Sequence, residues 1–346
     1  MSRGFSRYLC AMATPHQADI KRVQALLAND MHAFKPKFRA TVSTDVALLD
    51  TIMQYVLRRK GKQMRPMFVF LSARLHGGLQ PDGTLVDRAY TAGSLIELLH
   101  TATLVHDDVV DESPLRRGVF SIQALWQKKI AVLVGDYLLS RGLLAAVDAE
   151  AFDLLKITSR AVREMSEGEL LQIEKARRLD ITEEVYFDII RRKTASLIAA
   201  CCAAGAASAG ADEDRVEHMR AFGEAVGIAF QIKDDLLDFA PTSATGKPKG
   251  GDLKERKMTL PLIHTLQQQS GGRRRSMVRD IKRSAERPEV AARLLEDIQA
   301  GPGIAYAESK MAEYRDRAVA MLDALPESPA RAALADLVEF TTSRNR

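Results

Sequence analysis

The feature that most constrains this chain is a cluster of three aspartates that occurs twice. The first copy is Asp107-Asp108-Val109-Val110-Asp111, and the second is Asp234-Asp235-Leu236-Leu237-Asp238. Each copy has the pattern D-D-x-x-D and lies in a segment with apolar, helical periodicity. Residues four apart share one face of a helix, so the first and last acids of each copy point the same way.

Such clusters need a cation, because three carboxylates on one helical turn repel one another and an apolar setting increases the cost. Hard oxygen ligands suit Mg²⁺, which combines one or two carboxylates with water and phosphate oxygens. A single copy would be weak evidence, since acid-rich helix faces are common. Two copies with apolar intervening residues indicate buried helices, and two such clusters facing each other predict a multi-metal site for a diphosphate.

Composition favours an all-α fold. The chain has 346 residues, of which 46% are hydrophobic and only 6% aromatic, and we find no serial strand alternation or hairpin signals. No domain linker is evident, so we expect one domain over residues 17–346 after a flexible lead-in at residues 1–16. From the sequence we expect no apolar stretch long enough to span a membrane. Beyond the first acid cluster we expect continuous helices over 122–147, 151–176, 183–209 and 213–239, a loop over 241–257, and three further helices.

The net charge of +5 is compatible with nucleic acid or an anionic membrane surface. The densest basic run, Arg273–Arg275 with Arg279, Lys282 and Arg283, is interpreted as a solvated loop and helix start. We therefore expect no nucleic-acid partner. The three cysteines show no metal spacing, and the adjacent pair Cys201-Cys202 cannot easily form a disulfide, which favours a reducing, cytoplasmic location.

Several basic residues are candidates for holding diphosphates. Lys62 and Arg65 lie at a helix start, where free N–H groups also favour anions; solvated surface charge is the alternative. His100, about two turns before Asp107, could donate to an anion or be a satisfied core histidine. Arg116 and Arg117 follow the first acids, with local charge compensation as the alternative for one of them.

A further set of candidates surrounds the second cluster. Lys193 and Thr194 lie in an apolar helical run, so the lysine is expected to point into a polar cavity. Gln231, one turn before Asp235, could polarise a substrate group. Lys247 and Lys257 lie in the loop after the second acids, where they could cap the same diphosphate.

These motifs, in this order, resemble the trans-isoprenyl diphosphate synthases, the polyprenyl synthetase family, and most closely its long-chain bacterial octaprenyl group. The resemblance covers about Thr44 to Thr342. It rests on the segments Gly61–Pro66, His100–Asp108, Arg116–Gly118, Gly135-Asp136, Gly168-Glu169, Lys193–Ala195, Gln231–Asp238 and Gly246–Pro261.

The resemblance implies an isoprenoid-synthase helical bundle around a central cavity, with about three Mg²⁺ per site. It implies that Asp107, Asp111 and Asp234 bind metal and that Asp108, Asp235 and Asp238 support it. The allylic diphosphate would be held by Arg116, Lys193, Lys247 and Lys257. Isopentenyl diphosphate would be held by Lys62, Arg65, His100 and Arg117. Thr194 and Gln231 would lie near the allylic cation.

The implied reaction joins an allylic diphosphate, farnesyl diphosphate being the expected primer, to successive isopentenyl diphosphates in the trans configuration. The small residues Ala102 and Thr103, one turn before Asp107, would wall the tunnel for the growing tail. In short-chain members of the family, bulky aromatics at these positions stop the product early. A C40 octaprenyl product is therefore expected, with C45, C50 and a shorter geranylgeranyl product as alternatives. A quinone side chain is the expected use, with residues around 133–137 setting the tunnel floor.

Other classes share parts of the pattern. A terpene cyclase would usually lack the second D-D-x-x-D, and a non-catalytic partner subunit would usually have lost one of the two. A metal-dependent phosphohydrolase would leave Asp234–Asp238 unexplained. The family further implies a homodimer, and an insoluble product implies weak peripheral contact with a membrane.

Overall fold

The computed structural model describes residues 15–58, 63–116, 118–178, 181–239, 257–284 and 286–343. In this part of the chain the strand structure is limited to one short antiparallel ribbon and one isolated bridge. The all-α class predicted from composition and periodicity is therefore confirmed. Residues 1–14 of the predicted lead-in lie outside the described residues, and Pro15 and His16 already belong to the first helix.

The helices and strands follow one another along the chain. The first half contains α1 (Pro15–Leu26), α2 (Ala28–Thr41), α3 (Ala47–Arg58), α4 (Met64–Leu75), α5 (Asp87–Val110), β1 (Leu115–Arg116), β2 (Val119–Phe120), α6 (Ile122–Trp126), α7 (Lys128–Asp148) and α8 (Phe152–Arg178). The second half contains α9 (Glu183–Ile190), the π-helical turn η1 (Arg191–Ala195), α10 (Ser196–Ser208), α11 (Glu213–Asp238), α13 (Leu260–Gln267), α14 (Gly271–Ser284), α15 (Pro288–Ala300), α16 (Gly303–Leu322) and α17 (Pro329–Ser343).

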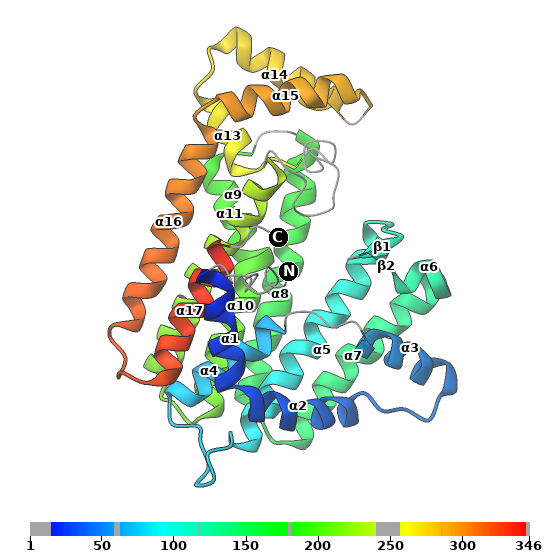
Figure 1. The fold of residues 1–346 in the computed structure, drawn as a ribbon. Coiled ribbons are helices and arrows are strands. Elements are labelled where there is room, and N and C mark those ends of the chain that lie inside the picture. The colour runs from blue at the N-terminus through cyan, green and yellow to red at the C-terminus, as the bar shows by residue number, and fades with distance from the viewer. Residues whose placement is uncertain are drawn as a thin grey trace, which may run out of the picture.

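The centre of the bundle is α10, whose thirteen residues are all buried. It packs against α4, α5, α8 and α11. In Figure 1 the long helices stand side by side, α14 and α15 cross the upper end, and α2 and α3 lie at the lower right. Because α10 is built almost entirely of small residues, its neighbours approach its backbone closely.

Glycines on α11 make the closest of these approaches. A Cβ added to Gly227 would lie 2.4 Å from the Cα of Ala195, and one added to Gly223 would lie 2.6 Å from the carbonyl oxygen of Ile198. Neither position leaves room for a side chain without movement of the backbone. The absence of side chains at these points therefore fixes how near α11 lies to η1 and α10.

Four expectations differ from the structure. The helix predicted over 122–147 is divided at Gln127, whose φ of 75° ends α6 before α7 begins. The helix predicted over 183–209 contains the π turn η1. The polar loop after Asp111 holds the ribbon of β1 and β2. Five helices rather than three follow residue 257, because short connections divide the periodic pattern.

One helix corrects the expectation that no stretch is long enough to span a membrane. By length and composition alone α7 could do so, and only 28% of its most apolar window is buried. The apolar exposed side chains of this helix include Leu133 at 58% and Leu144 at 50% exposure. The helix therefore carries an apolar surface that the described part of the chain does not cover.

Substituting Gly227 by alanine tests the close approach of α11 to η1. We expect Gly227→Ala to lower the free energy of unfolding by about 1–3 kcal/mol, because the new methyl group would overlap the backbone of Ala195. The matched control is Gly142→Ala in the middle of α7, where the added Cβ would meet Leu98 at an ordinary 3.8 Å. The control should be neutral or stabilise by up to about 1 kcal/mol. Urea unfolding of both variants measures the difference, and equal stabilities would contradict the packing argument.

Candidate active site

Each acid cluster lies at the C-terminal end of a long helix, α5 or α11. The carbonyl of Gly78 accepts a hydrogen bond of 3.1 Å from Val86 at the start of α5, and a Cβ on Gly78 would lie 2.9 Å from that of Ala209, shortly before α11. Both helices therefore begin at one end of the bundle (Figure 1). They have 24 and 26 residues and carry their acids in the last turn. At about 1.5 Å per residue, both clusters are about 30 Å from that end.

The helix termini make this placement electrostatically unfavourable for the acids. Asp111 is the C-cap of α5, and Asp238 is the last residue of α11. The C-terminus of a helix carries a partial negative charge from its free carbonyl groups, so carboxylates are destabilised there and cations are favoured. The donor set is therefore six hard oxygen-bearing side chains at two negative helix ends, which suits divalent cations such as Mg²⁺.

The loop after the first cluster is tied back to it. Asp108 is only 3% exposed, and its carbonyl accepts hydrogen bonds from the backbone N–H of Ser113, at 3.0 Å, and from the side chain of Gln123. The Gln123 amide also donates to the carbonyl of Ser113 at 3.0 Å. The first cluster is thus held by α6 as well as by its own helix.

His106 connects α5 to α7. Its Nε2 lies 3.2 Å from the carbonyl of Val132 and 3.5 Å from Oδ1 of Asp136. The ring packs so closely that a Cβ on Gly135 would lie 2.0 Å from Nε2. His106 is therefore held against α7 at Val132, Gly135 and Asp136.

The second cluster is centred on a chain of side-chain hydrogen bonds. The Tyr186 hydroxyl donates to Oδ2 of Asp235 at 2.7 Å, and Nε2 of Gln231 donates to Oδ1 at 2.9 Å. The Thr194 hydroxyl donates to Oε1 of Gln231 at 2.7 Å. An ionised carboxylate only accepts hydrogen bonds, so Asp235 requires Gln231 to turn its NH₂ group toward it and its carbonyl oxygen toward Thr194.

The π turn η1 presents Lys193 toward α8. Lys193 forms an ion pair with Glu169 and donates to Oε1 of Gln172 at 3.2 Å. A Cβ on Gly168 would lie 2.7 Å from the backbone nitrogen of Lys193. The lysine charge thus meets polar groups of α8 rather than the apolar core. Single π turns are common at functional sites.

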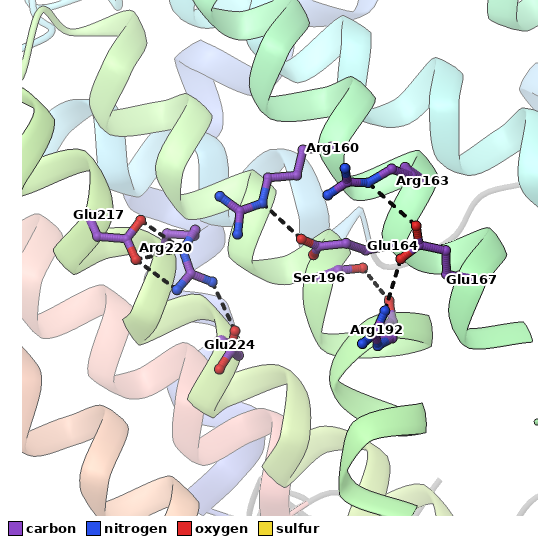
Figure 2. A network of polar contacts seen from close by, with 9 residues as sticks. All are labelled: Arg160, Arg163, Glu164, Glu167, Arg192, Ser196, Glu217, Arg220 and Glu224. Atoms are coloured by element: carbon purple, nitrogen blue, oxygen red, sulfur yellow. Dashed lines mark hydrogen bonds and ion pairs between the residues drawn. The ribbon is translucent and has the colours of Figure 1, made fainter. Parts of the chain in front are cut away.

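Arg192 clamps η1 between α8 and α9, and Figure 2 shows its contacts with Glu167 of α8 and with Ser196. Its Nε donates to both carboxylate oxygens of Asp188, at 3.0 and 3.1 Å, and its Nη1 to Glu167 at 2.9 Å. Its carbonyl accepts from the hydroxyl of Ser196 at 2.5 Å. Burial opposes ionisation of Asp188, but hydrogen bonds from Arg192 and Arg191 outweigh it and lower the pKa of this carboxyl. The hydrogen bonds that Arg192 donates to Asp188 in turn raise the pKa of the guanidinium.

The other basic candidates are spread over different elements. Arg65 lies half-buried in the first turn of α4 after Gln63, whose φ of 51° is left-handed. Burial raises the pKa of the Cys201 thiol, and the charge of Arg65 partly offsets this increase. His100 is half-buried on α5, and its carbonyl accepts from the Thr103 hydroxyl at 2.9 Å.

Ala102 and Thr103 have different surroundings. Ala102 is fully buried in an apolar cluster with Val134, while Tyr137 packs against that cluster and Thr103 is half-buried. Lys257 is half-buried where the described chain resumes before α13. The candidates Lys62, Arg117 and Lys247 lie outside the described residues, as does the side chain of Arg116.

The structure brings Thr194, Gln231 and Asp235 into direct hydrogen-bond contact. The other described candidates lie on α4, α5, η1 and α11 and just before α13. Within the residues that the structure describes, no three His, Cys, Asp or Glu side chains converge closely enough to hold a metal ion directly.

Sequence reasoning missed two residues of this site, Tyr186 and Arg192. The tyrosine lies two turns before Lys193, a spacing that places both on one side of a regular helix. The spacing gives no sign of the partner on α11. Arg192 stands next to Lys193, where a second charge in a helical run is easily interpreted as solvated.

Comparisons with known proteins agree with this geometry. The profile of the polyprenyl synthetase family matches residues 46–298. The all-trans-nonaprenyl-diphosphate synthase (geranyl-diphosphate specific) of Rhodobacter capsulatus is 38% identical, covering 93% of this chain and 97% of the relative. The octaprenyl diphosphate synthase of Escherichia coli is 33% identical, covering 95% of this chain and 100% of the relative.

The fold is likewise shared with solved structures. The crystal structure of a polyprenyl synthase from Caulobacter crescentus, complexed with calcium and isoprenyl diphosphate, superposes with a TM-score of 0.85. It is 35% identical in sequence, covering 94% of this chain and 98% of that one. The phosphohydrolase and non-catalytic alternatives are therefore set aside. By sequence, by fold and by its paired acid helices, the chain belongs to the polyprenyl synthetase family and is a prenyltransferase of the long-chain polyprenyl diphosphate synthase kind.

Proposed function

We propose that this enzyme extends an allylic diphosphate with several isopentenyl diphosphates to an all-trans C40 octaprenyl diphosphate, with farnesyl diphosphate as primer. The observation that carries the proposal is that one D-D-x-x-D turn lies at the C-terminal end of α5 and another at the C-terminal end of α11. The relatives named as octaprenyl and nonaprenyl synthases support a long product. A C45 or C50 product and a geranyl primer are the alternatives, and a quinone side chain is the proposed use.

In this proposal Asp107, Asp111 and Asp234 hold about three Mg²⁺ with the allylic diphosphate. The metal, when bound, neutralises the departing diphosphate. Asp235 has a supporting role, because both of its carboxylate oxygens accept hydrogen bonds from Tyr186 and Gln231. Asp108, which is buried, and Asp238 are proposed to support the metal-binding acids as well.

The basic candidates divide between two diphosphates. Lys193, Lys257, Arg116 and Lys247 hold the allylic diphosphate, and Lys193 would exchange its contacts with Glu169 and Gln172 for phosphate oxygens. The second set would hold isopentenyl diphosphate without metal, and consists of Lys62, Arg65, His100 and Arg117.

Thr194 and Gln231 are proposed to stabilise the allylic cation after the diphosphate leaves. The hydrogen-bond chain to Asp235 directs the Gln231 carbonyl oxygen toward Thr194. Oxygen lone pairs held in place by such a chain stabilise positive charge without reorganisation during the reaction. The double bond of isopentenyl diphosphate then attacks C1, and loss of one proton completes the trans C5 extension.

The two acid clusters provide the direct test. We expect Asp107→Asn and Asp234→Asn each to lower kcat for isopentenyl incorporation at least about 100-fold, because each removes a charge that holds the metal-bound diphosphate. The measurement is incorporation of radiolabelled isopentenyl diphosphate with Mg²⁺ and either farnesyl or geranyl diphosphate. Chelation should abolish activity, and Mg²⁺ should restore it. Asp153→Asn, on the exposed surface of α8, is the control. Release of phosphate instead of pyrophosphate would contradict the proposal.

Product length is proposed to depend on Thr103 and Ala102. We expect Thr103→Phe to shorten the main product from about C40 to C20 or less, because an aromatic ring one turn before Asp107 would block the tail. Thr101→Phe is the matched control, being the same residue type, half-buried, on nearly the opposite side of the helix. Ala102 is less suitable because it is fully buried in the core. Chromatography of dephosphorylated products gives the lengths, and an unchanged distribution for Thr103→Phe would exclude this role.

We further propose a homodimer, with the uncovered apolar face of α7 as the interface. Val132, Leu133, Leu143, Leu144 and Val147 are each more than 40% exposed along this helix. Exposed apolar side chains gathered on one face of a helix favour association with a partner. Weak peripheral contact with a membrane and a cytoplasmic location, which the two buried free thiols of Cys201 and Cys202 favour, complete the proposal.

Sedimentation equilibrium tests the dimer. We expect the wild type to have twice the mass of one chain, and Leu133→Glu combined with Leu144→Glu to shift it to the mass of one chain, because two charges would be buried in the interface. Leu48→Glu, at a 50% exposed leucine of α3, should leave the dimer intact. A monomeric wild type, or a protein that enters membranes and resists extraction by salt, would assign α7 a different partner.

A further inference from the structure

The basic residues of α14 concentrate the charge of the whole molecule. Its fourteen residues contain six Lys or Arg and one Asp, giving a net charge of +5, which equals that of the entire chain. The remainder of the chain is therefore neutral overall. This run was interpreted from sequence as a solvated loop and helix start, but it is a continuous amphipathic helix whose buried side consists of Met277, Ile281 and Ser284.

The basic side chains form one exposed face. Arg275, Arg279, Lys282 and Arg283 occupy helix positions i, i+4, i+7 and i+8, and all are exposed. The one acid of α14, Asp280, faces away from them and pairs with Arg293 of α15 at 2.9 Å. The face therefore carries several positive charges, and the only acidic residue of α14 lies outside it.

The position of α14 suits contact with a flat surface. With α15 it crosses the upper end of the molecule (Figure 1), and Gln299 of α15 donates to the carbonyl of Phe239, the residue after Asp238, at 2.8 Å. The basic face is therefore coupled to the end of the bundle at which α11 carries its acids. No aromatic side chain interrupts the helix, so base stacking of the kind used for single-stranded nucleic acid has no platform there.

We propose that this face of α14 docks the enzyme on an anionic lipid bilayer. Clusters of four to eight Lys and Arg on an amphipathic helix bind anionic membranes, with an attraction that salt screens. The partner follows from charge complementarity. The purpose rests on the proposed function, whose long prenyl product is insoluble in water and must reach a lipid phase. Since the face carries no exposed large apolar side chain, the contact is electrostatic and reversible.

Vesicle co-sedimentation without substrates tests the docking. At low salt the wild type should bind vesicles of phosphatidylcholine containing roughly one-third phosphatidylglycerol and should not bind phosphatidylcholine alone. The variant Arg275→Gln/Arg279→Gln/Arg283→Gln should bind the anionic vesicles about 100-fold more weakly. The matched control, Lys21→Gln/Lys35→Gln/Arg39→Gln, removes equal charge from exposed positions of α1 and α2 and should bind as the wild type does.

Three results would overturn the proposal: equal binding by the α14 variant and wild type, equal binding to both vesicle types, or tighter binding of duplex DNA than of anionic vesicles at the same salt. Prenyl elongation is measured separately in detergent, where the α14 variant should match the wild type. A protein that binds vesicles but does not elongate would refute the proposed function alone. A protein that elongates but does not bind vesicles would refute the docking alone.

Discussion

Negative charge gathered at the negative ends of two helices is the constraint on which the site depends. Asp111 caps α5 and Asp238 ends α11, so the acids and the helix dipoles act in the same unfavourable direction. Both helices start near Gly78 at one end of the bundle and carry their acids in the last turn. Metal ions and cationic side chains from other elements must offset this negative charge. The site is therefore assembled by packing rather than by any one helix.

The carboxylate of Asp235 orients the side chains around it, above all the amide of Gln231. Because a carboxylate only accepts hydrogen bonds, it determines which end of the Gln231 amide faces Thr194. Tyr186 occupies the other carboxylate oxygen and so links α9 to the same chain of contacts. Thr194 and Gln231, which are expected to lie near the allylic cation, are thus held in place by Asp235, which is not expected to bind metal directly.

The sequence predicted the helical class and the acid clusters because both depend on local spacing, which survives in any fold that buries one helix face. It did not predict Tyr186, whose partner lies on another helix and is invisible to periodicity. The break at Gln127 was missed because the apolar pattern continues across it, while only the backbone shows the left-handed φ. The basic run of α14 was recognised, but its single exposed face depends on Met277 and Ile281 packing against the rest of the fold.

The π turn at Arg191–Ala195 gives the second half of the site a dependence on residue count. A π turn contains one residue more than the α-helical turn it replaces, and each residue rotates a helix by about 100°. The face that carries Tyr186 before the turn is therefore out of phase with the face that continues into α10. Thr194 can reach Gln231 while every residue of α10 stays buried. The rotational offset between α9 and α10 depends on the number of residues in the turn. Deleting one residue there can therefore remove the offset, even if the side chain of that residue has no role of its own.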